Sequence, residues 1–197
     1  MATPRSVDGA PGWCQQHLIA TDVGALRQAQ VLLARMQDRF YVEPPPGFAA
    51  HRVGAHLRHI LEFYECFLDG VESGHVDYDA RRRDGSVEAS RHAALARIAS
   101  IIHRLENTLA LPAESKVTVR MEDAPADSAD NSRLVSSLGR ELQVLASHTV
   151  HHFALIAMTL SAHGFRVERD FGVAPSTLRY RSSLDRGTAV EAAQCAP

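Results

Sequence analysis

Three of the chain's eleven histidines fall within five positions of one apolar segment, "ASHTVHHFALIAMTL" at residues 146–160. His148 and His152 are four residues apart, so on a helix their rings lie one turn apart on the same face. Two neutral imidazoles at this spacing can bind one divalent metal ion, as they do in HExxH motifs. The alternative is a pair of histidines that are solvated or that hydrogen-bond separately. The pair by itself leaves both interpretations open.

A histidine from another part of the chain turns this pair into a candidate metal site. His59 lies in "GAHLRHILEFYECF", between Leu57 and Ile60 on the apolar face of a second predicted helix. One imidazole from that helix and two from the other provide three nitrogen ligands and leave positions open, as in catalytic zinc sites. His56, one turn earlier, is the runner-up ligand. Three imidazoles accept zinc, nickel, iron or manganese, so a divalent metal ion is predicted without its identity.

Other polar residues could support such a site. Glu141 lies seven residues before His148 on the same helical face, where it could hydrogen-bond a ligand or a metal-bound water; a surface carboxylate is the alternative. His151 points about 100° around the helix from its neighbours, which suits a helix interface, a pocket edge or exposure to solvent. The segment Arg81–Arg83 is either a solvated loop or an anion clamp over the site. Phe171–Arg181 either walls a pocket or packs as a tail.

Helices must position these residues. In the first predicted helix Thr21 is the expected N-cap and Asp22 lies in the first turn. One short strand is expected at 117–121, inside a connection of more than twenty residues. Long helices with one long crossover predict an all-α four-helix bundle with an irregular C-terminal tail. Apolar residues at three- and four-residue spacing predict the helices over about 22–41, 49–71, 87–111 and 134–163.

The length and charge of the chain limit the classes of function. The 197 residues suit one domain over 1–183, with its core at about 20–180, and a tail at 184–197 that is expected to be disordered. Lys and Arg number 21 against 23 Asp and Glu, so no basic surface for nucleic acid or a membrane is expected. The three cysteines form no CxxC pair and no secretory signal is recognisable, which favours the cytoplasm.

The segments "HLRHILEFYECFLDG" and "HTVHHFALIA" resemble the DinB/YfiT-like superfamily of metal-binding four-helix bundles. The resemblance extends over about residues 20–180 and places the family's metal ligands on His59, His148 and His152. The pattern around His59 is also similar to the DinB-type domain of the sulfoxide synthases of ergothioneine biosynthesis. The large C-terminal domain of those synthases has no counterpart in this sequence, so their reaction is not expected here.

Two functions follow from this resemblance and from the three histidines. The first is a metal-dependent enzyme, a hydrolase or a thiol S-transferase, in which the ion activates water or a thiol toward a small substrate. The resemblance implies a low-molecular-weight thiol as a possible partner, and a homodimer. The second is a non-catalytic metal-binding bundle with a structural, stress-response or sensor role. The sequence does not choose between them.

Overall fold

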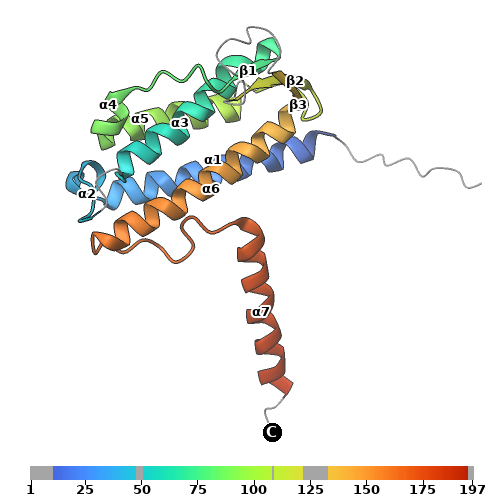
Figure 1. Ribbon diagram of the computed structural model, residues 1–197. Coiled ribbons are helices and arrows are strands. Elements are labelled where there is room, and N and C mark those ends of the chain that lie inside the picture. The colour runs from blue at the N-terminus through green and yellow to red at the C-terminus, as the bar shows by residue number, and fades with distance from the viewer. Residues whose placement is uncertain (1–10, 48–50, 108, 122–132, 195–197) are drawn as a thin grey trace, which may run out of the picture.

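The computed structural model describes residues 11–47, 51–107, 109–121 and 133–194 of the chain. The fold is mostly helical: α1 contacts α5 and α6, and α3 contacts the same two helices, so these four lie side by side (Figure 1). A small sheet lies at one end of them (Figure 1). The elements are α1 (Pro11–Arg35), α2 (Asp38–Val42), α3 (Val53–Gly70), the 3-10 turn η1 (Val71–Ser73), β1 (His75–Asp77), α4 (Gly85–Ala89), α5 (Arg91–Asn107), β2 (Lys116–Arg120), β3 (Arg133–Ser137), α6 (Leu138–Ala162) and α7 (Pro175–Gln194).

The two helices that carry the histidines of interest are held by local signals and by their apolar faces. Ser137 is the N-cap of α6, and its hydroxyl accepts a hydrogen bond from the Arg140 N–H. Gly164, just beyond the helix, adopts the left-handed conformation (φ 74°) that commonly ends helices. The residues that α3 and α6 bury follow helical spacing and pack into the common core; in α3 they include Leu57, Ile60, Leu61, Tyr64 and Phe67, and in α6 Leu142, Leu145, Phe153, Ile156 and Leu160.

The first helix differs from its prediction. It begins at Pro11 rather than near Asp22, because proline is accommodated in a first turn and the apolar spacing continues upstream through Leu18. Thr21 is therefore not an N-cap: its hydroxyl donates to the His17 carbonyl inside α1. The expected helix at 87–111 is likewise divided at Ser90, where the backbone is extended, and its second part ends at Asn107.

The sheet has three strands where the sequence predicted one. β2 falls on the expected strand, β1 pairs with it in parallel, and β3 pairs with it antiparallel. β3 occupies residues that were expected to begin the last helix, which instead starts at Leu138. β1 is only three residues long, too short for its alternation to predict a strand, so only its pairing with β2 reveals it.

The C-terminal segment is not irregular throughout. Before α7, Phe171 packs back onto the core and stacks on Phe153, with ring centroids 4.6 Å apart. From Pro175 the chain forms α7, which projects away from the other helices (Figure 1). This helix continues to Gln194, into the stretch expected to be disordered; residues 195–197 lie outside the described residues.

By length and composition α6 would also pass as a membrane-spanning helix, a property that it shares with the core helices of many proteins. In this structure one face of α6 packs against α1 and α3. The same helix carries Glu141, His148 and His152 toward the protein interior.

Candidate metal centre

Three histidine rings from two helices come together at one point. His59 of α3 and His148 and His152 of α6 each offer one ring nitrogen, and these nitrogens all lie within 4.8 Å of one another. The Nε2 atoms of His59 and His148 are 3.1 Å apart. Two ligands of a tetrahedral zinc ion with bonds of about 2.0–2.1 Å are separated by roughly 3.3 Å, so this spacing suits a shared ion. All three rings are half-buried.

The surroundings of His148 and His152 keep both of these rings neutral. Burial, followed by the neighbouring His59, lowers the pKa of His148 to about 4. Burial, followed by the neighbouring His148 and His59, lowers the pKa of His152 to about 3. A neutral imidazole has a free lone pair on one nitrogen, which is the form that binds a metal ion. Near neutral pH, His148 and His152 are therefore in the protonation state that a cation requires.

The other two candidate histidines lie beside this group rather than in it. The Nδ1 atom of His56 is 3.1 Å from the Nδ1 atom of His152, so the runner-up ligand hydrogen-bonds to a member of the group. Such an outer partner orients the ring that it contacts. His151 is exposed, and its ring centroid is 5.2 Å from that of His152.

Comparison with known proteins identifies the family. Residues 23–156, more than half of the chain, match the sequence profile of the DinB superfamily. The chain belongs to the DinB superfamily. A segment of FK506-binding protein 5 from Rhizopus delemar is 33% identical over 107 residues, which cover 53% of this chain and 27% of that protein. This DinB chain thus spans about a quarter of the length of that relative. No solved structure matches it significantly.

Glu141 is buried in this DinB protein and is not the surface carboxylate considered from the sequence. Its two oxygens accept hydrogen bonds from Tyr78 Oη (2.9 Å) and Ser136 Oγ (2.5 Å). Tyr78 stacks on Phe63, with centroids 5.0 Å apart, and Phe63 stacks on His148, with centroids 4.3 Å apart. Glu141 is therefore connected to the histidine group through two stacked rings and does not contact a histidine itself.

Phe63 was missed by the sequence reasoning, although a signal was present. It follows His59 by four residues on α3, so both side chains share one helical face, and their rings are in edge-to-face contact at 4.8 Å. An aromatic ring at this position fixes the orientations of His59 and His148 together. Phenylalanine on an apolar helical face usually indicates only core, which is why its contact with the histidines was not predicted.

A second group of buried polar residues lies in the core next to the three histidines. Tyr64 donates a hydrogen bond to Asp22 Oδ1 (2.6 Å) and accepts one from Thr149 Oγ1 (3.2 Å). Burial raises the pKa of Asp22 to about 8, so near neutral pH this carboxyl is largely protonated. Thr149 adjoins His148 in α6. The sequence placed Asp22 in the first turn of a helix, and only the earlier start of α1 and the packing of α3 reveal its burial.

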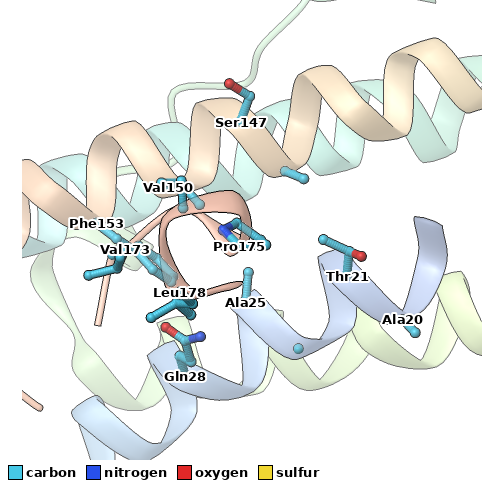
Figure 2. Close-up of a pocket in the computed structure, with 14 residues that line it drawn as sticks. Ala20, Thr21, Ala25, Gln28, Ser147, Val150, Phe153, Val173, Pro175 and Leu178 are labelled. Atoms are coloured by element: carbon cyan, nitrogen blue, oxygen red, sulfur yellow. The ribbon is translucent and has the colours of Figure 1, made fainter. Parts of the chain in front are cut away.

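The pockets found among the described residues do not include His59, His148 or His152 in their linings. One, of about 460 Å³, is lined by α1, α6 and the beginning of α7 (Figure 2). By helical spacing, the residues of α6 that line it lie on the face opposite His148 and His152. Its lining is largely apolar and includes Ala25, Val150 and Leu178 (Figure 2). Within the segment Phe171–Arg181, residues 172–175 and Leu178 line this pocket, which is separate from the three histidines. Phe171 instead packs on Phe153, as the tail-packing interpretation expected.

Proposed function

We propose that this DinB protein is a metal-dependent enzyme in which His59, His148 and His152 hold a divalent ion beside a small substrate. The observation that carries the proposal is the convergence of three ring nitrogens within 4.8 Å of one another. Among the described residues, no carboxylate or thiolate belongs to this group, and three nitrogen ligands leave positions for water or substrate. The half-buried rings are reachable from solvent.

The residues present fit a divalent cation of the kind that imidazole binds. Neutral nitrogen donors suit zinc, nickel, iron or manganese, and cellular supply decides among them. When bound, such an ion lowers the pKa of a coordinated water or thiol. The protein side chains supply the orientation: Phe63 stacks on His148, and His56 hydrogen-bonds to His152. The reaction we favour is hydrolysis or S-transfer, with a low-molecular-weight thiol as the second candidate nucleophile.

A second candidate is a non-catalytic protein with a structural or sensor role. The observation that favours it is that the three rings come only from α3 and α6, two helices in direct contact. An ion shared between them would brace these helices and raise the stability of the fold. In that case chelation lowers the melting temperature strongly, while thiol and ester probes are never turned over by the metal-loaded protein.

Elemental analysis of protein purified without a polyhistidine tag tests the shared site. We expect about one ion per chain in the wild type and its loss in His59→Ala, His148→Ala and His152→Ala, because two remaining imidazoles bind far more weakly. His151→Ala is the matched control, since this exposed neighbour on α6 lies outside the group and its loss leaves the metal content unchanged. Full metal content in His59→Ala and His152→Ala would exclude the site.

A further inference from the structure

We infer that Arg81 and a divalent ion exclude each other at His59, and that the guanidinium released by the ion binds an anionic group of the substrate. This inference rests on the proposed metal site and adds a substrate class to it. It also resolves the two interpretations of the segment Arg81–Arg83. Of its three arginines, Arg81 reaches the histidine group, whereas Arg82 pairs with Asp69 on the outer side of α3.

Arg81 lies on a segment that runs beside α3 between β1 and α4 (Figure 1). The segment is tied down at both ends: the Tyr78 N–H donates to the Arg120 carbonyl (3.0 Å), and the Asp84 N–H donates to Glu62 Oε1 (2.7 Å). The backbone therefore keeps Arg81 near the metal centre. Its long side chain can still swing within that range, because four rotatable bonds separate the guanidinium from the backbone.

The exclusion follows from the hydrogen bond that Arg81 makes. One guanidinium nitrogen of Arg81 lies 2.8 Å from His59 Nδ1. Arginine has no acceptor, so His59 Nδ1 must be the acceptor, and the proton of the neutral His59 ring is then on Nε2. That N–H faces His148 Nε2 at 3.1 Å, which accepts. The proton of His148 is therefore on Nδ1, a buried atom that has no hydrogen-bond partner among the described residues.

His148 and His59 consequently differ in whether their Nε2 atom has a lone pair available for a cation. His148 already presents the lone pair of Nε2 toward the other rings, whereas the Nε2 atom of His59 carries a proton. If the ion binds His59 Nε2, the proton moves to Nδ1 and faces the Arg81 donor. If the ion binds Nδ1, it takes the place of the guanidinium. In either case Arg81 must leave His59, because a neutral imidazole has only one nitrogen lone pair. Only an imidazolate, which has lost both N–H protons, could bind the ion and accept from Arg81 at the same time.

The released guanidinium defines the substrate class. While it is hydrogen-bonded to His59, this guanidinium lies over the ring of Phe63, with its central carbon 5.0 Å from the ring centroid. A guanidinium binds carboxylate, sulfonate and phosphate groups through paired N–H donors. Because the ion breaks the hydrogen bond between Arg81 and His59, an anion that binds the same N–H donors and the ion must raise each other's affinity, by the same factor in both directions. An anionic small molecule is the substrate that this arrangement recognises.

Zinc titration of the metal-free, tag-free protein against a competing chelator tests the coupling. Arg81→Leu should bind zinc about tenfold more tightly than the wild type, because loading no longer breaks a hydrogen bond or displaces a charge. Replacing chloride by sulfate at equal ionic strength should raise the zinc affinity of the wild type roughly two- to fivefold and leave that of Arg81→Leu unchanged. A variant that merely damaged the fold would bind zinc less tightly.

The controls make every outcome decisive. Arg82→Leu removes a neighbouring arginine that lies outside the site, so both its zinc affinity and its sulfate response should match the wild type. If Arg81→Leu does not fold, Arg81→Gln removes the charge with a smaller change in volume and should behave in the same way. Equal or weaker zinc binding in the Arg81 variant, or an unchanged sulfate response, would overturn the inference. Zinc binding that is indifferent to His59→Ala and His148→Ala would overturn the proposed site itself.

Discussion

The pH dependence of stability depends on one buried carboxyl group, that of Asp22. Its side chain is fully buried, and burial raises its pKa from 3.8 to about 8 in the folded protein. Between those pH values the folded protein retains a proton that the unfolded chain has released. The contribution of Asp22 to the free energy of unfolding is therefore fully present below pH 3.8. It falls by about 1.4 kcal/mol per pH unit as the pH rises, until it is lost above the folded pKa.

Asp22→Asn removes this titration, because an amide has no proton to release. Its Oδ1 can still accept from Tyr64. Its N–H donors add unsatisfied polar groups to the core, and these lower the stability at acidic pH by about 1–3 kcal/mol. The wild type should lose about 2.7 kcal/mol more than the variant between about pH 5.5 and about pH 7.5. At alkaline pH the difference in stability between the two proteins should therefore shrink or reverse.

Urea unfolding followed by helical circular dichroism, in metal-free buffer of constant ionic strength, measures this difference. Asp170→Asn is the control, because this carboxylate is 64% exposed and its loss should leave the pH slope of the wild type unchanged. Parallel pH profiles for Asp22→Asn and the wild type would refute the reasoning. They would mean that Asp22 is already ionised in the folded state and that burial does not raise its pKa.

Two further substitutions test the packing around the site. Tyr78→Phe removes the hydroxyl that donates to the buried Glu141 and should lower the free energy of unfolding by about 1–3 kcal/mol. Zinc binding should persist, because the ring at position 78 still stacks on Phe63. Loss of zinc binding would show that the hydroxyl itself positions the ligands. Gly54→Ala places a Cβ 2.2 Å from the Glu88 carbonyl oxygen and should lower the free energy of unfolding, measured in urea, by about 1–3 kcal/mol. Gly24→Ala is the control: its Cβ enters open space and should not lower the stability. Equal stability of the two alanine variants would contradict this packing.

Much of the candidate site could be predicted from local spacing. Residues four apart share one face of a helix whatever else the chain does, so the pairing of His148 with His152 followed from the sequence alone. The apolar face around His59 indicated that this ring points inward. The meeting of the two helices was an inference from their amphipathic faces and from the resemblance to a family, and the structure brings the three rings together.

The surroundings of those rings depended on contacts between distant parts of the chain. Arg81 lies 22 positions from His59, and nothing in its local sequence distinguishes it from the two arginines that follow it. The sheet was recognised only in part, because strand pairing joins segments whose own patterns are too short to be informative. Helix boundaries also shifted where a neighbouring strand competed for the same residues, as at the start of α6.

The amino-acid sequence by itself determined which residue types could bind a cation and on which helical faces they lie, because helical periodicity is a property of the local backbone. Only the tertiary structure decided their chemical state. The proton positions on His59 and His148 depend on a guanidinium from another segment, and the raised pKa of Asp22 depends on burial beneath two further helices. Hydrogen-bond partners and desolvation are set by what the folded chain packs together, and local spacing does not encode them.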